Sequence, residues 1–289
     1  MPENAILCLT KGYKGRRGYK KLIKRTLSIF KQNWAHNYDH IIFHEGNITI
    51  DDQQYIKDNL TSNADYIKFI SIAHMFQQGK LLTKYARNKL CRRNFTSNRY
   101  SYGYKTMCYF WFVGFLRYCQ SYSNILRIDE DCFLEPNQED PAISVKNAVF
   151  ASPFTQGMDN SNLIIGMKKL FTSFIGKSVN KWVSPYTNVM WINIKWASQP
   201  IIQKIQKTVV DSNCIFINRW GDLPLWGITL HILGKKIYPL RLDYYHESHH
   251  SIISGNKKRD LKTLLCVICI IFLIFISIFL FNKLRRQFK

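Results

Sequence analysis

The stretch ILRIDEDCFLEP, residues 125–136, places three consecutive carboxylates, Asp129, Glu130 and Asp131, directly after an apolar run. Carboxylates are scarce in this chain, which has 19 aspartates and glutamates against 41 lysines and arginines. A short apolar run that ends in polar residues is typical of a buried strand. We therefore predict a strand over 123–134, with the three carboxylates towards its carboxyl end.

The sequence before this stretch alternates between strand-like and helix-like segments. We predict strands at 5–10, 40–46 and 65–72, and helices at 19–34, 51–60 and 106–119. This alternation is typical of a parallel sheet with helical crossovers, a class of fold that binds ligands at the carboxyl ends of its strands. Neither a G-x-G-x-x-G nor a Walker A loop follows the first strand, which argues against a dinucleotide-binding domain and a P-loop NTPase.

The acidic cluster has the composition of a metal site. Alternate side chains of an extended strand share a face, so Asp129 and Asp131 are expected to point together and Glu130 away from them. Two carboxylates on one side suit a hard cation such as Mg²⁺ or Mn²⁺, which completes its shell with water and phosphate oxygens. A solvated turn or a salt-bridged pair is the structural alternative, and a D-x-D triplet does not decide between them.

Two later segments carry further candidate site residues. Asp222 lies in a Gly-Asp-x-Pro turn between Trp220 and Trp226, where the aromatic rings could form the stacking wall of a sugar site or simply pack in the core. His246 lies in the histidine-rich segment 241–250 and is either a nitrogen ligand for the metal or a surface histidine.

The composition limits the class of partner. The chain has 289 residues and a formal net charge of +22, which favours phosphate-bearing substrates, polyanions or an anionic membrane surface. Its basic residues are spread widely without a DNA- or RNA-binding signature, so no nucleic acid is expected as a partner. The six cysteines outside 263–282 are scattered without C-x-x-C spacing and are interpreted as buried apolar residues.

Residues 263–282 form a run of 20 residues without charge, flanked on both sides by lysines and arginines. A run of this length matches the hydrocarbon core of a bilayer, so we predict a single transmembrane helix. The first residues show no signal peptide. We therefore expect a C-terminal anchor in the ER, the Golgi or a related internal membrane. The globular part is placed in the cytosol by default, and the topology is left open.

Several segments, taken in order, resemble the fungal α-1,2-mannosyltransferases of glycosyltransferase family 15. AILCLTKG (5–12) and RTLSIFKQNWAHNYDHIIFHEG (25–46) are similar to that family's opening strand, helix and second strand. YKTMC (104–108) resembles its Y-R-H-M-C, and LRIDEDCF (126–133) its arginine–acidic–x–Asp motif. The most specific likeness is that of RWGDLPLWGITLHIL (219–233) to the family's R-W-G-D-x-P segment, and LDYYH (242–246) resembles its closing aromatic–histidine stretch.

The resemblance implies an α/β fold, namely a GT-A (Rossmann-like nucleotide-diphospho-sugar transferase) domain with a mostly parallel central sheet. The domain would occupy 1–250, followed by a basic juxtamembrane linker (251–262), the transmembrane helix (263–282) and a basic tail (283–289).

Site residues are implied position by position. Asp129, Asp131 and His246 would hold Mn²⁺ (or Mg²⁺) against the diphosphate of a sugar nucleotide, and Asp129 would also contact the nucleotide sugar.

Other positions would line the donor and acceptor sites. Thr10, Lys11 and Arg127 would contribute to the nucleotide-sugar pocket. Tyr104 would lie close to the donor phosphates, and Asp222 would lie in the acceptor or catalytic region.

The function implied is transfer of a hexose, mannose from GDP-mannose in the first instance, onto a glycan or glycoprotein acceptor. The alternatives are a GT-A transferase that uses a UDP-sugar, a catalytically inactive membrane-bound relative, and a metal-dependent phosphotransferase or nuclease. The chain departs from the family at Lys195, which corresponds to the glutamate of the family's N-F-E-I segment, and this leaves retention or inversion open. It also departs in its anchor, because the fungal enzymes are anchored at their N-termini inside the Golgi.

Overall fold

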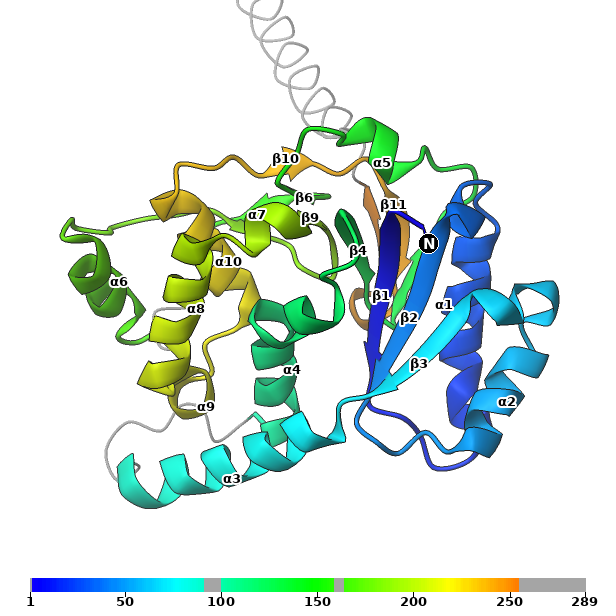
Figure 1. Ribbon diagram of the computed structural model, residues 1–289, viewed down its shortest axis with the longest axis horizontal. Helices are drawn as coiled ribbons and strands as arrows, with labels where there is room; N and C mark the ends of the chain where they lie inside the picture. The colour runs from blue at the N-terminus through cyan, green and yellow to red at the C-terminus, as the bar shows by residue number, and fades with distance from the viewer. Residues whose placement is uncertain (1, 91–99, 159–163, 255–289) are drawn as a thin grey trace, which may run out of the picture. The chain divides into compact units, whose positions relative to one another are not determined.

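The centre of the molecule is a seven-stranded sheet with the order β10-β6-β9-β4-β1-β2-β3. The computed structural model describes residues 2–90, 100–158 and 164–254 (Figure 1). The strands of this sheet are β1 (Asn4–Thr10), β2 (Tyr38–His44), β3 (Ile67–Ser71), β4 (Asn124–Ile128), β6 (Phe150–Ser152), β9 (Val189–Asn193) and β10 (Tyr238–Pro239). Strand β9 runs antiparallel to both of its neighbours, and the other pairs are parallel. The predicted mostly parallel central sheet is therefore confirmed.

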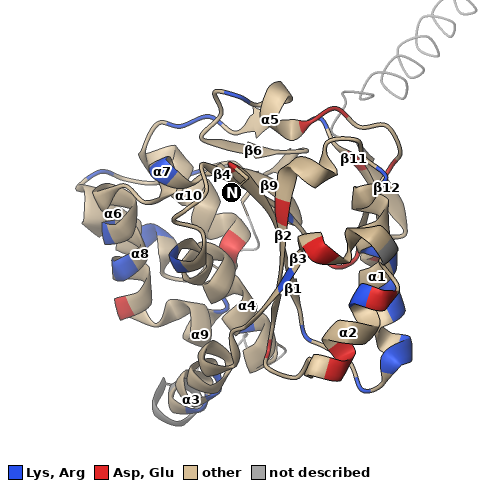
Figure 2. Cartoon of the chain, turned by 45° about the vertical axis from the view of Figure 1, so that its right-hand side comes forward, with Lys and Arg blue, Asp and Glu red and all other residues tan. Residues whose placement is uncertain are grey.

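Helices cover both faces of the sheet. They are α1 (Lys20–Phe30), α2 (Ile50–Asp58), α3 (Ala73–Leu90), α4 (Tyr102–Phe112), α5 (Pro141–Ser144), α6 (Met167–Ile175), α7 (Ile194–Ala197), α8 (Pro200–Ser212), α9 (Cys214–Asn218) and α10 (Asp222–Ile232). Helices α1 and α2 lie on one side of the sheet, and α4, α8 and α10 lie on the other (Figure 1). Figure 2 shows lysines and arginines on helices of both sides, including α1, α6 and α8.

Strand β1 shows why the apolar runs in this sequence do not alternate with polar residues. Ala5 and Leu7 pack in the core on the side of α4 and α10, whereas Ile6 and Cys8 pack in the core on the side of α1. All four side chains are buried. A strand covered on both faces has to be apolar at consecutive positions.

Helix α1 also holds the segment that carries the carboxylates. Its buried Arg25 donates a hydrogen bond from Nη2 to the carbonyl oxygen of Ile128, the last residue of β4, at 2.7 Å. Beyond the helix, Gln32 donates from Nε2 to the carbonyl oxygen of Glu135 at 2.9 Å. These two bonds fix both ends of the stretch between Ile128 and Glu135 against the α1 side of the molecule.

The prediction of one continuous strand over 123–134 is wrong. Strand β4 ends at Ile128, and a separate strand, β5 (Cys132–Leu134), begins after a turn. The backbone N–H of Cys132 donates to the carbonyl oxygen of Asp129 at 3.1 Å and closes this turn. Strand β5 then joins an antiparallel three-stranded sheet with β11 (Asp243–His246) and β12 (Ser251–Ser254).

The folded part extends slightly beyond the predicted domain boundary. Residues 251–254, which were assigned to the linker, form β12 and pair with β11, so the folded part continues to Ser254. Among the helices of the described ranges, none has the length and apolar character that crossing a bilayer requires. The predicted transmembrane helix at 263–282 and the basic tail at 283–289 lie outside the described residues and stay predictions.

The burial of His40 predicts that the stability of this fold depends on pH. Its ring stacks on Phe30 with 4.2 Å between centroids, and Nε2 donates to the carbonyl oxygen of Ala35 at 2.9 Å. Burial lowers the pKa of His40 to about 4, although the bond to Ala35 opposes this shift. The unfolded chain takes up a proton below its ordinary pKa of about 6.5 while the folded protein does not. The free energy of unfolding should therefore fall by up to about 3 kcal/mol as the pH drops from about 6.5 to about 4.

Substitution of this residue tests the expectation. His40→Gln keeps an N–H group that can reach Ala35 but removes the titration, so its stability should change less over the same range. Urea denaturation at about pH 7 and about pH 5 measures both proteins. An equal loss of stability in the two would assign the pH dependence to other groups.

Candidate functional site

The carboxylates lie in the turn between β4 and β5, not along a strand. The backbone N–H of Asp129 donates to the carbonyl oxygen of Asn188 at 2.9 Å, which ties the turn to the residue before β9. The three side chains have three different partners: Asp129 contacts Arg127, Glu130 contacts Tyr13 and Asp131 contacts His246. We expected Asp129 and Asp131 to share one face of a strand. In the structure they instead belong to two neighbouring groups of side chains.

The first group is a buried ion network centred on Arg127 of β4. Its guanidinium donates from Nε and Nη2 to the two carboxylate oxygens of Asp129, at 2.7 and 2.9 Å. Its Nη1 donates to Asp222, the first residue of α10, at 2.6 Å. The ring of Trp111 lies 4.3 Å from the guanidinium carbon. The network connects the acidic turn to the Gly-Asp-x-Pro segment, two sites that are 93 positions apart in the sequence.

The two carboxylates of this network stabilise the positive charge of Arg127. Burial by itself would lower the pKa of Arg127, but the carboxylates of Asp129 and Asp222 outweigh that effect and raise it. The guanidinium of Arg127 therefore stays protonated and positively charged inside the protein. Its planar fork is suited to holding two carboxylates in fixed positions.

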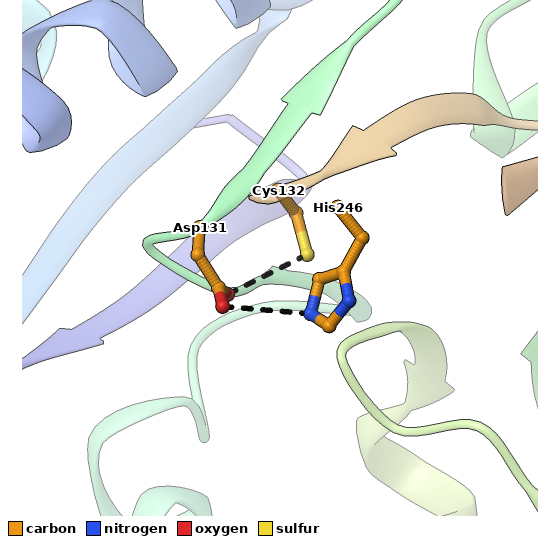
Figure 3. A group of neighbouring side chains, drawn as sticks. All are labelled: Asp131, Cys132 and His246. Carbon is orange, nitrogen blue, oxygen red and sulfur yellow. Dashed lines mark hydrogen bonds and ion pairs between the residues drawn. The ribbon is translucent and has the colours of Figure 1, made fainter. Parts of the chain in front are cut away.

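The second group, Asp131, Cys132 and His246, is shown in Figure 3. Cys132 of β5 pairs directly with His246 of β11, and Asp131 precedes Cys132 in the chain. Asp131 Oδ2 lies 3.5 Å from His246 Nε2, and Asp131 Oδ1 lies 3.9 Å from Cys132 Sγ. The potential ligand atoms of the three residues all lie within 4.8 Å of one another. Asp131 and His246 were predicted as candidate ligands from the sequence, whereas Cys132 was interpreted as a buried apolar residue.

Neighbouring groups fix the positions of Asp131 and His246. Ser248 donates a hydrogen bond from Oγ to Asp131, and Asn188 Nδ2 lies 2.9 Å from His246 Nε2. Burial opposes ionisation of Asp131, but its contacts with His246 and Ser248 hold its pKa well below the ordinary value. His246 is buried, and its Nδ1 has no hydrogen-bond partner in the described part of the chain. The nitrogen that faces Asp131 is Nε2, and together with the carboxylate of Asp131 and the sulfur of Cys132 it forms a donor set that fits a divalent cation.

Glu130 points to a separate place. Its Oε1 accepts a hydrogen bond from the hydroxyl of Tyr13 at 2.6 Å. Burial and this carboxylate both raise the pKa of Tyr13, so that the hydroxyl keeps its proton. Glu130 thus anchors the loop after β1 to the acidic turn.

Thr10 and Lys11 lie at the carboxyl end of β1, on the same edge of the sheet as the turn. The side chain of Thr10 is buried and its Oγ1 accepts a hydrogen bond from the N–H of Gly12 at 3.2 Å. Lys11 is exposed. Nearby Glu45, directly after β2, has its pKa raised to about 7 by burial, with the charge of Lys11 opposing the shift. Glu45 was not among the residues predicted from the sequence, because the shift in its pKa depends on burial in the folded chain.

Tyr104 lies in the first turn of α4. Its hydroxyl accepts a hydrogen bond from Arg219 Nη2 at 2.7 Å, and the same guanidinium lies 4.9 Å from its ring centroid. The guanidinium also lies 4.1 Å from the ring of Tyr100. Because Arg219 stands three residues before Asp222, this contact brings the YKTMC and RWGDLP segments together, as the resemblance requires of two parts of one site.

Lys195 is not at the site. Asn193 at the end of β9 pairs with Asn124 at the start of β4, and Lys195 follows in α7. At about 3.3 Å per residue, this end of the strand pair lies roughly 16 Å from the acidic turn. The residue of β9 that pairs with Arg127 is the buried Met190. Strand β9 therefore contributes no carboxylate to the site.

Together these observations define the class of fold. The sheet is mostly parallel and has helices on both faces. An acidic turn follows the carboxyl end of its central strand β4, and a histidine from a distant segment, His246, lies beside that turn. This is the layout of the GT-A fold of nucleotide-sugar transferases.

Comparison with solved structures supports this assignment. Mannosyltransferase Ktr4p from S. cerevisiae is similar with a TM-score of 0.64 at 12% sequence identity, over 84% of this chain and 70% of that chain. Core-mannan synthase A (CmsA/Ktr4) from Aspergillus fumigatus, in a Mn/GDP form, is similar with a TM-score of 0.59 at 11% identity, over 84% and 74%. No protein-family model matches the sequence, and no curated protein is significantly similar to it. At these identities the likeness establishes the GT-A fold, and the predicted fold class is confirmed for the described residues.

Proposed function

We propose that this chain is a metal-dependent glycosyltransferase that moves a hexose from a sugar nucleotide to a glycan or glycoprotein acceptor. The observation that carries the proposal is the convergence of Asp131, Cys132 and His246 at the carboxyl end of β4 in a GT-A fold. Ligands of open α/β sheets bind at this edge. The ionised carboxylate and the buried histidine provide a donor set for a divalent cation, Mn²⁺ or Mg²⁺.

The preferred donor is GDP-mannose. Two observations support this choice: the similar S. cerevisiae enzyme is a mannosyltransferase solved in complex with GDP, and the similar A. fumigatus enzyme was solved in a Mn/GDP form. In the present chain, Thr10 and Lys11 lie at the end of β1 on the same edge of the sheet. We assign them to the nucleotide pocket, where the exposed ammonium of Lys11 would contact phosphate oxygens.

The reaction requires stabilisation of the negative charge that develops on the departing nucleoside diphosphate. A bound divalent cation supplies a Lewis acid for that charge. Arg219, positioned by Tyr104, adds a fixed positive charge close to Asp222 in the chain. Arg127 holds Asp129 and Asp222 in place. We propose that Asp222 orients a hydroxyl group of the acceptor and that Asp129 contacts the donor sugar or the metal.

Three alternatives to this proposal are a transferase with another donor, an inactive relative, and a phosphotransferase or nuclease. A GT-A transferase for a UDP-sugar would keep the metal group and differ in the nucleotide pocket. An inactive relative would keep the fold, and the lack of a carboxylate on β9 is the observation that favours it. A phosphotransferase or nuclease would instead bind polynucleotides with a steep dependence on salt.

Donor screening separates these possibilities. We expect the purified chain with Mn²⁺ to bind and slowly hydrolyse labelled GDP-mannose, to lose this activity on chelation and to regain it when Mn²⁺ is restored. Turnover of a UDP-sugar in preference would reassign the donor. A chain that binds none of the sugar nucleotides, with or without metal, would exclude the transferase.

We further propose that residues 263–282 tether the protein to an internal membrane as a single-pass C-terminal anchor. Retention in the membrane fraction after alkaline carbonate extraction is expected, and its loss when 256–289 are deleted is the matching control. Release of the full chain by carbonate would contradict the anchor. Glycosylation reporters fused to each end would show which side the site faces.

A further inference from the structure

We infer that Cys132 is a metal ligand and that the site takes a thiophilic divalent cation, such as Zn²⁺ or Co²⁺, more tightly than Mn²⁺. The inference rests on the proposed function in one respect, since it assigns the class of metal for that same site. It adds a sulfur ligand to a site that the sequence suggested was built from oxygen and nitrogen alone.

The placement of Cys132 follows from strand pairing. It lies directly opposite His246 in the antiparallel pair of β5 and β11, so the two side chains are on the same face. Asp131, at the end of the turn, brings its carboxylate to the sulfur from the other side (Figure 3). Three different donor atoms, oxygen, sulfur and nitrogen, thus converge from two strands and one turn.

The spacing is close to that of a three-ligand cation site. The carboxylate of Asp131 is 3.5 Å from His246 Nε2 and 3.9 Å from Cys132 Sγ. Ligand atoms around a tetrahedral zinc ion are about 3.4–3.7 Å apart, given metal–ligand distances of about 2.0–2.3 Å. The remaining separation is at most 4.8 Å, so closing the site requires a movement on the order of 1 Å.

Burial distinguishes this group from an ordinary core cysteine. Cys132 and His246 are 0% and 1% exposed, and the ligand atoms of Cys132, His246 and Asp131 lie within 4.8 Å of one another. Cys119, by contrast, is buried in the core on the α4 side and belongs to no such ligand group among the described residues. Both cysteines are therefore buried, but of the two, within the described ranges, Cys132 faces potential metal ligands and Cys119 does not.

A sulfur ligand from Cys132 would change which metal ion the site prefers. Thiolate ligands favour zinc and other soft or borderline ions, whereas carboxylates, carbonyls and water favour magnesium and manganese. When the cation binds, the thiol of Cys132 loses its proton to bulk water and the sulfur forms the bond to the metal. A fourth position stays available for water or a phosphate oxygen, as in catalytic zinc sites with three protein ligands.

Cobalt substitution provides the test. We expect the metal-free chain to bind Co²⁺ and to show a near-ultraviolet sulfur-to-cobalt charge-transfer absorption. Cys132→Ser should remove this absorption and weaken Zn²⁺ binding about tenfold or more, while Mn²⁺ affinity changes by less than about threefold. The matched control, Cys119→Ser, should leave both the spectrum and the affinities unchanged.

The outcomes separate the inference from the function on which it rests. Binding of Co²⁺ and Mn²⁺ without the charge-transfer absorption would overturn the role of Cys132 and leave the metal-dependent transferase intact. Failure to bind any of these ions, with circular dichroism showing a folded chain, would overturn both. If Cys132→Ser does not fold, His246→Ala keeps the thiol and tests whether the two residues share one site. Loss of the absorption supports the shared site, and an unchanged absorption at unchanged Co²⁺ affinity overturns it.

Discussion

Replacing Asp131 by asparagine is expected to lower transferase turnover by about 10³-fold. Asparagine keeps the size of the side chain but removes its negative charge, so the cation loses the ionised ligand of the group in Figure 3. Metal stabilisation of developing charge contributes several kcal/mol, and each 1.36 kcal/mol corresponds to a factor of ten in rate. Initial rates of labelled-sugar transfer at saturating donor, measured over a range of Mn²⁺ concentrations, give the effect.

The matched control for this change is Asp211→Asn. Asp211 is an exposed carboxylate at the end of α8 that pairs with Lys207 at 2.8 Å, away from the acidic turn. The same chemical substitution there should leave the rate within about twofold, because exposed ion pairs contribute little. If the Asp131 variant kept wild-type turnover at every Mn²⁺ concentration, the metal group would not be part of the active site.

The same titration tests Asp129, which the resemblance names as a metal ligand. In the structure both of its carboxylate oxygens accept hydrogen bonds from Arg127. Asp129→Asn should therefore weaken Mn²⁺ binding less than Asp131→Asn does. Equal weakening would mean that Asp129 releases Arg127 and turns to the metal when the cation binds.

The strand pattern predicted the sheet because it depends on local features of the sequence. Apolar runs such as 5–10 are typical of strands that are buried on both faces. In the segment that begins near Tyr19, the apolar residues recur at a spacing that places them on one face of a helix. From this alternation the carboxyl end of β4 could be identified as a ligand-binding edge. The prediction did not depend on knowing any long-range contact.

The site was predicted less completely because its geometry depends on contacts between distant segments. The turn after Ile128 is tied to a distant segment by a bond from the N–H of Asp129 to the carbonyl oxygen of Asn188, 59 positions away, and no local signal distinguishes such a turn from a continuing strand. Cys132 became a candidate ligand only through its register with His246. Lys195 was placed at the site by a sequence correspondence, and the register of β9 against β4 moves it to the other end of the sheet.

The largest effect on stability is expected from Arg127→Met. Methionine fills part of the volume but leaves the carboxylates of Asp129 and Asp222 facing each other without the positive charge between them. Removing one partner of a buried ionic network destabilises a protein by about 3–5 kcal/mol, because the remaining charges are uncompensated. Urea denaturation followed by circular dichroism measures the loss. Arg117→Met is the matched control, since Arg117 is exposed and its replacement should cost no more than about 0.5 kcal/mol.

A compensating variant distinguishes lost charge balance from lost packing. Asp129→Asn and Asp222→Asn added to Arg127→Met neutralise the network, and we expect the triple variant to recover at least about half of the lost stability. Recovery of activity is not expected, because Asp222 would no longer have the charge with which it orients the acceptor. If the triple variant is as unstable as Arg127→Met alone, the arginine stabilises the fold through its packing on Trp111 and not through its two carboxylates.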